Sequence, residues 1–91
     1  MPDVEAPGFR EEYAALEQAL AWVAWNEGDC AVASSAAGRA LKANARNAQA
    51  LLVAGLCQER AGEIGQAYTT LKRVRELAPE DPVAAEALRV V

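Results

Sequence analysis

The sequence predicts an all-α fold of about five helices, and three observations support this prediction. Alanine is the commonest residue and proline is scarce, with 4 in 91 residues, a composition that favours helix. Large apolar residues recur at spacings of three and four, as on one face of a helix. Residues 14–47 also align on residues 48–81 with a period of 34 residues, and a period of roughly 20–50 residues is typical of stacked repeats.

The aligned positions share small residues, a turn glycine and polar helix ends. The pairs are Ala21 and Gly55, Gly28 and Gly62, Asp29 and Glu63, Ala33 and Ala67, Ala37 and Leu71, Ala40 and Val74, Ala45 and Pro79, and Asn47 and Asp81. On these residues the chain resembles the tetratricopeptide repeat family. The resemblance implies antiparallel helix pairs that stack as a solenoid, or superhelix, with the first helix of each pair lining a concave groove.

The chain is expected to form one domain after a flexible N-terminal segment. The segment carries Pro2, Pro7 and Gly8 and few apolar groups, which is typical of a mobile terminus. Phe9 is the exception and is able to pack onto the first helix. The expected division is a lead-in at 1–10 and one domain at 11–91, made of repeat 14–47, repeat 48–81 and a capping helix at 82–91.

The first helix is expected at 11–27 and the second at 30–43. In the first, Leu16, Leu20 and Val23 are spaced as a core stripe. Trp22 and Trp25 fall on a neighbouring stripe with Gln18. Gly28 then ends the helix, because glycine adopts the left-handed backbone that a helix end requires. Asp29 is the expected N-cap of the second helix, whose Ala33, Ala37 and Ala40 allow close approach of a neighbour.

The third helix is expected at 48–61, the fourth at 64–78 and the fifth from residue 82. Asn47 is the expected N-cap of the third helix, and Gly62 closes it. Ile64, Ala67, Leu71 and Val74 form the expected core stripe of the fourth. Pro79 terminates that helix, and Asp81 followed by Pro82 is a start signal for the fifth.

Composition and charge argue against several classes of function. The formal net charge of −4 and the pI near 4.7 disfavour nucleic-acid partners, which require a basic surface. The longest apolar run, 48–57, is too short to insert into a membrane as a spanning helix. Two cysteines, Cys30 and Cys57, are too few for a disulfide scaffold and suit a reducing compartment. The expected location is therefore cytoplasmic.

The sequence also argues against catalysis. It contains no histidine, which removes the commonest general base and metal ligand. Cys30 stands at a helix N-terminus, where a thiolate is favoured, but no base accompanies it. We therefore expect a protein that is not an enzyme and that has no metal site and no cofactor.

The resemblance assigns the groove positions, and these are the candidate binding residues. They are Gln18, Trp22, Trp25, Asn26, Gln49, Leu52, Leu56, Glu59 and Arg60. Their apolar middle favours an amphipathic helix or an apolar peptide segment of a protein partner. The expected function is therefore a protein-interaction module, an adaptor or small chaperone.

Alternatives remain open at this point. Trp22 and Trp25 face either a partner, as the enrichment of tryptophan at binding hot spots favours, or the interior, covered by Phe9 or by the fifth helix. A second alternative is a structural module in which the two tryptophans and nearby leucines form a homodimer or extend the solenoid end to end. A third is a fragment of a longer repeat scaffold.

Overall fold

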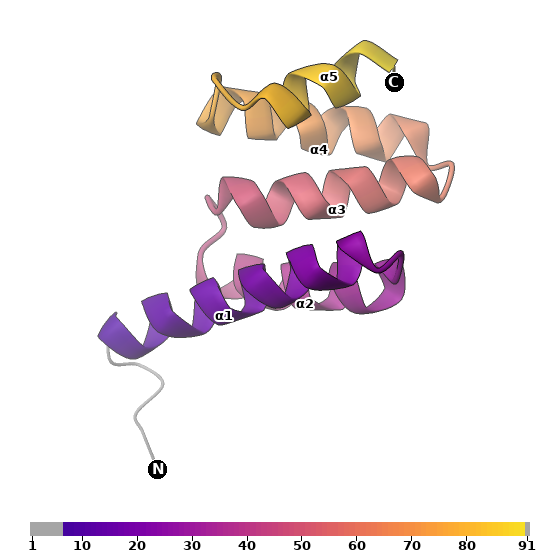
Figure 1. Ribbon diagram of the computed structural model, residues 1–91. Helices are drawn as coiled ribbons and strands as arrows, with labels where there is room; N and C mark the ends of the chain where they lie inside the picture. The colour runs from indigo at the N-terminus through magenta and orange to yellow at the C-terminus, as the bar shows by residue number, and fades with distance from the viewer. Residues whose placement is uncertain (1–6, 91) are drawn as a thin grey trace.

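The computed structural model describes residues 7–90, together with the side chains of residues 12–89. Within this part of the chain the fold is all-α, as predicted (Figure 1). The five helices are α1 (Pro7–Asn26), α2 (Cys30–Ala43), α3 (Ala48–Arg60), α4 (Ile64–Leu77) and α5 (Pro82–Val90).

The helix bounds agree with the predicted ones to within one residue except at the N-terminus. Helix α1 begins at Pro7, so the last part of the predicted lead-in is helical, because proline is well suited to a first helical position. The expected packing of Phe9, like residues 1–6, lies outside what the structure describes. Helices α1, α3 and α4 each end one residue earlier than predicted.

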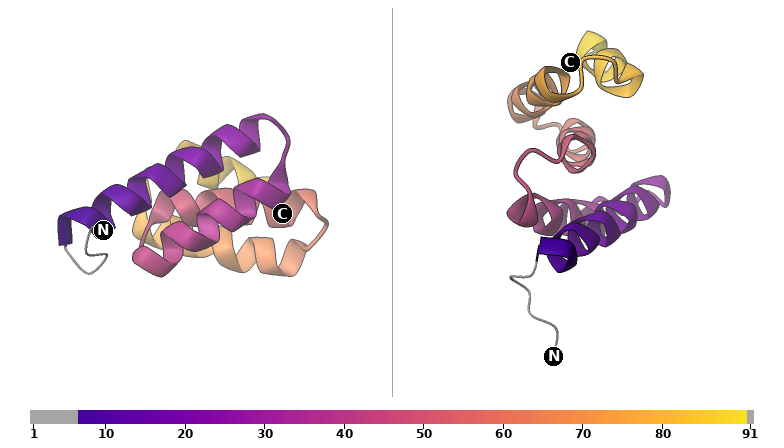
Figure 2. Two further views of the ribbon diagram at one scale, coloured as in Figure 1. Left: turned by 90° about the horizontal axis from the view of Figure 1, so that it is seen from below. Right: turned by 90° about the vertical axis from the view of Figure 1, so that its left-hand side faces the viewer.

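Consecutive helices run antiparallel and pack on one another along the stack. Helix α1 packs on α2, α2 on α3, α3 on α4 and α4 on α5, and α1 also touches α3. In the right-hand view of Figure 2, which looks roughly along the helices, α1 and α5 lie on either side of α3. This arrangement places α1, α3 and α5 along one side of the molecule.

The predicted caps and turns are confirmed. The side chains of Asp29 and Asn47 each accept a hydrogen bond of 3.1 Å, from the backbone N–H groups of Val32 and Ala50. Gly28 and Gly62 have φ angles of 81° and 83°, which a residue with a Cβ adopts only at a cost. The two turns that join the helices of each pair are therefore built alike.

The core consists of two clusters. The first joins α1, α2 and α3 and is built largely of alanine, with Val53 and Cys57 as its larger members. The second joins α3, α4 and α5 and contains Leu52, Leu56, Leu71 and Val74. The half-buried Trp22 and Trp25 pack against both. The tryptophans therefore lie at the junction between the clusters.

The predicted core stripe of the first helix is wrong. Leu16, Leu20 and Val23 are 71%, 41% and 53% exposed, whereas Ala21 and Ala24 are buried. Helix α1 faces the alanines of α2, and such a narrow interface has room for methyl groups and not for leucine. Ile64, the first residue of the stripe predicted for α4, is also exposed, at 46%.

No bond was predicted between the two cysteines, which were expected to suit a reducing compartment. Cys30 and Cys57 form a disulfide, with their Cα atoms 5.6 Å apart, within the range that disulfides require. The first residue of α2 lies beside the third turn of α3 in the fold, although the two cysteines are 27 residues apart in the chain. The bond therefore ties the first helix pair to the second.

Candidate functional site

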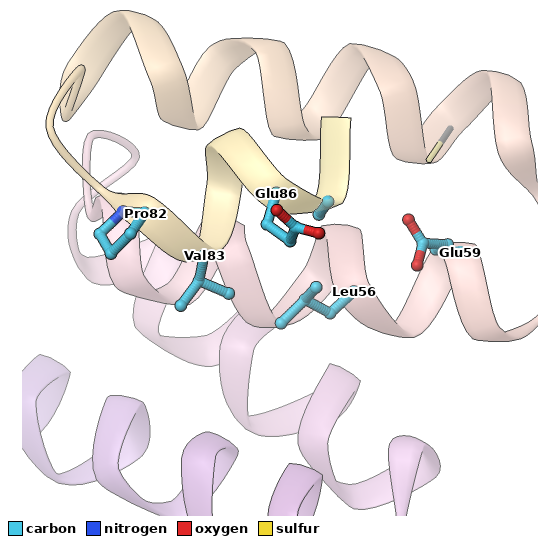
Figure 3. Close-up of a pocket in the computed structure, with 6 residues that line it drawn as sticks. Leu56, Glu59, Pro82, Val83 and Glu86 are labelled. Carbon is cyan, nitrogen blue, oxygen red and sulfur yellow. The ribbon is translucent and has the colours of Figure 1, made fainter. Parts of the chain in front are cut away.

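The candidate site is a shallow hollow between α3 and α5, on the side of the molecule that α1, α3 and α5 share (Figure 3). Its volume is ≈ 480 Å³, and its lining residues are Leu56 and Glu59 from α3 and Pro82, Val83, Glu86 and Ala87 from α5. Pro82 and Val83 lie at one end, Glu59 at the other, and Leu56 and Glu86 between them (Figure 3). The hollow is thus apolar at one end and acidic at the other.

Asp81 fixes the α5 side of the hollow. Its Oδ1 atom accepts hydrogen bonds from the backbone N–H of Val83, at 2.9 Å, and of Ala84, at 3.3 Å. These N–H groups have no partner within the helix, so the carboxylate caps α5. Val83 remains 45% exposed, and its side chain lies on the α3 side of α5 (Figure 3).

A hydrogen-bonded series connects α1, α3 and the start of α5. The indole Nε1 of Trp22 donates to Gln49 Oε1 at 3.1 Å, and Gln49 Nε2 donates to Asp81 Oδ2 at 3.2 Å. Both polar groups of the Gln49 side chain are therefore engaged within the protein. The series sets the relative positions of the three helices that line this side of the molecule.

Trp25 and Arg60 form a second contact between α1 and α3. The guanidinium carbon of Arg60 lies 4.0 Å from the centroid of the Trp25 ring, a cation–π geometry. The ring is half-buried against both core clusters, and the arginine covers one of its faces. This part of the surface is therefore already occupied by the chain itself.

Glu59 carries an unused acceptor beside the hollow. Its Oε2 atom is buried and has no hydrogen-bond partner within the described part of the chain, which is a costly state for a carboxylate oxygen. Glu86, also at the hollow, pairs with Arg89 at 3.4 Å on the exposed surface. A ligand that offers an N–H donor to Glu59 would satisfy this atom.

The predicted site residues line the hollow, join helices or belong to the core, except Gln18 and Asn26, which do none of these. Leu56 and Glu59 line the hollow, whereas Gln49, Trp22, Trp25 and Arg60 hold the helices together. Leu52 is 1% exposed and belongs to the core, Gln18 is half-buried and Asn26 is exposed. The hollow therefore gathers only part of the predicted set.

Sequence reasoning missed the residues that α5 contributes. Carrying the 34-residue period one step further places Val83 on Gln49 and Glu86 on Leu52, two positions already assigned to the groove. The period itself was thus the signal that could have found them. The capping helix supplies one wall of the hollow as well as a cover for α4.

The remaining features add no chemical centre within the described chain. A second hollow of ≈ 560 Å³ is lined by Gln58, Gly65, Gln66, Thr69 and Thr70. Among residues 7–90 no three His, Cys, Asp or Glu residues are grouped as ligands for a metal ion. No helix in that range is both long and apolar enough to cross a membrane.

Comparisons with protein-family models, with curated proteins and with solved structures find no match for this chain.

Proposed function

We propose that the chain is a protein-interaction module of the tetratricopeptide type, an adaptor or small chaperone without catalytic activity. Support for the type comes from the 34-residue period, the paired antiparallel helices and the two turn glycines with positive φ. Support for the binding role comes from the side formed by α1, α3 and α5, where the hollow lies.

The proposed ligand is an amphipathic helix or peptide segment that inserts an apolar side chain into the hollow. The volume of ≈ 480 Å³ falls within the range of about 300–1,000 Å³ that is usual for ligand pockets. Leu56, Val83 and Ala87 provide apolar contact for such a side chain. Burial of the exposed part of Val83 would contribute hydrophobic free energy to binding.

The acidic end of the hollow favours a basic residue next to the apolar one. Glu59 has a buried carboxylate oxygen without a hydrogen-bond partner in the described chain, and Glu86 lies beside it (Figure 3). A lysine or arginine on the ligand would donate to these oxygens in a charge-assisted bond. This combination of an apolar contact and an unused carboxylate is the observation that carries the proposal.

A cytoplasmic location stays a prediction. The Cys30–Cys57 disulfide weighs against it, because structural disulfides persist mainly in oxidising compartments. The proposed binding role does not depend on the compartment.

Selection from a random peptide library on the immobilised protein tests the proposal. We expect enrichment of peptides that carry a large apolar residue beside lysine or arginine. Val83→Asp should weaken the selected peptides at least about tenfold, since it places a charge in the apolar end of the hollow. Val32→Asp is the matched control, because Val32 is similarly exposed, at 41% against 45%, and lies on α2.

Two results would contradict the proposal. One is a Val83→Asp variant that binds the selected peptides as the unmodified protein does. The other is equal weakening by both substitutions, which would indicate a general effect on the fold. Glu59→Gln refines the test, since it should reduce the preference for a basic residue while the apolar preference remains.

A further inference from the structure

The outer face of α1 carries a stripe of exposed apolar side chains that the hollow does not use. The stripe consists of Tyr13, Leu16, Leu20 and Val23, which are 37%, 71%, 41% and 53% exposed. Their spacings of three, four and three residues are those of the a and d positions of a coiled-coil seam. The stripe is therefore continuous along one side of α1.

The equivalent residues of α3 indicate how this helix face packs elsewhere in the fold. One period further along the chain, Leu16, Leu20 and Val23 correspond to Ala50, Ala54 and Cys57 of α3. These three residues pack in the first core cluster, together with α2 of the preceding pair. The stripe is thus the uncovered equivalent of an interface between helix pairs, and here it has larger side chains.

We infer that the stripe is the contact surface for a second copy of this chain, joined through an antiparallel pair of α1 helices. The spacings are symmetric about the middle of the stripe, so a twofold axis near Gln18 brings Leu16 opposite Leu20 of the partner subunit. The same axis brings Tyr13 opposite Val23 of the partner subunit. A self-complementary surface is what a twofold dimer requires, and the binding hollow between α3 and α5 shares none of its lining residues with the stripe.

The area of the stripe suits a weak dimer. From their exposed fractions, the four side chains present on the order of 350 Å² per copy, within the roughly 300–600 Å² of the largest patches on monomers. The flanking Ala15 and Ala19, both exposed, allow close approach and add to this area. The four side chains of both copies together present about 700 Å², below the roughly 1,200 Å² of stable specific interfaces and in the range of weak, transient ones.

The charges beside the stripe set the salt dependence of this dimer. Near the axis, Glu17 is neutralised by Arg39 at 2.8 Å. Glu12 and Glu27 are both exposed at the ends of the stripe, and the antiparallel arrangement brings Glu12 within about one helical turn of Glu27 of the partner subunit. Their repulsion is screened by salt, so the dimer should strengthen as the salt concentration rises.

Sedimentation equilibrium over a range of protein and salt concentrations tests the inference. We expect a monomer–dimer equilibrium whose dissociation constant rises at least about tenfold with Leu16→Gln, since this side chain lies at the centre of the stripe. Leu16 is 71% exposed, so helical content should not change. Ile64→Gln, at a residue 46% exposed on α4, should leave the equilibrium unaltered.

A substitution that strengthens the dimer separates this contact from general damage to the fold. Glu27→Lys should lower the dissociation constant and reverse the salt dependence, because it places a positive charge near Glu12 of the partner subunit. A chain that stays monomeric at millimolar concentration would overturn the inference. So would a dimer that survives Leu16→Gln but is lost with Val83→Asp, since that result places the contact at the hollow.

Discussion

The two helix pairs occupy equivalent positions along the period, yet they fill their central contact differently. In the first pair the equivalent positions hold Ala21 and Ala37, both fully buried. In the second pair they hold Gly55 and Leu71, and a Cβ atom on Gly55 would lie 2.8 Å from Leu71 Cδ2. Two methyl groups in one pair thus correspond to a large side chain against a bare backbone in the other.

This difference leaves the first pair with less hydrophobic stabilisation. Alanine buries much less apolar area than leucine, and each Å² of buried apolar area contributes roughly 25 cal/mol to stability. The first pair has other connections instead, which are the Cys30–Cys57 disulfide, the Glu17–Arg39 ion pair and the contact of Arg60 with Trp25. We therefore expect the second pair to depend on its side-chain volume and the first on its cross-links.

The largest expected effect comes from removing side-chain volume in the second pair. Leu71 is fully buried and packs with Leu52, Leu56 and Val74, so Leu71→Ala should leave a cavity. The loss in the free energy of unfolding should lie in the upper part of the range of about 2–5 kcal/mol. Urea denaturation followed by circular dichroism measures it. A loss below about 1 kcal/mol would show that the second pair does not depend on this side chain.

The disulfide should have the next largest effect, and it should act mainly on the first pair. Replacing both Cys30 and Cys57 by serine removes a cross-link that closes a loop of 27 residues, which should cost about 3 kcal/mol. Hydrogen exchange should then increase more in α1 and α2 than in α4. Reduction of the unmodified protein should give the same pattern, whereas a uniform increase would contradict the proposed division of roles.

A double-mutant cycle at Gly55 and Leu71 tests the packing difference itself. Gly55→Ala alone should cost about 1–3 kcal/mol, because the new methyl group meets Leu71. In the Leu71→Ala background the same change should cost nothing or gain up to about 1 kcal/mol, because alanine favours helix over glycine. The cycle is read from urea denaturation of the four proteins. Additive effects would show that the two residues do not share one space.

The smallest expected effect is that of the ion pair in the first helix pair. Arg39→Ala should lower the free energy of unfolding by about 0.5 kcal/mol or less, since the Arg39 side chain is 43% exposed and solvent screens such pairs. The difference should vanish at high salt. Arg73→Ala is the control, because Arg73 pairs with Glu76 within α4 and does not join two helices.

Much of the fold could be predicted from the sequence because the residues that begin and end its helices act locally. Asp29, Asn47, Gly28 and Gly62 act on the residues next to them, so the helix ends follow from a few positions at a time. Within the described residues, all five helices lie where the period and these signals place them. The departure at Pro7 has the same local origin, since proline starts a helix as readily as it interrupts one.

The inward face of α1 and the α5 side of the candidate site could not be predicted from such local signals. Hydrophobicity favours Leu16 as a core residue, but the close approach of α2 selects Ala21 instead, and that distance is a property of the assembled pair. The disulfide and the bond from Gln49 to Asp81 join residues distant in the chain. Only Leu56 and Glu59 of the lining of the hollow were expected, because α5 was interpreted as a cap.

The position of Trp22 and Trp25 makes the protein a natural optical reporter. They are the only tryptophans of the chain, and each touches both core clusters. Their emission consequently senses the seam between the clusters, whereas far-ultraviolet ellipticity senses all five helices together. If one end of the stack melts before the other, the two signals will change at different temperatures, and no dye or label is needed to see it.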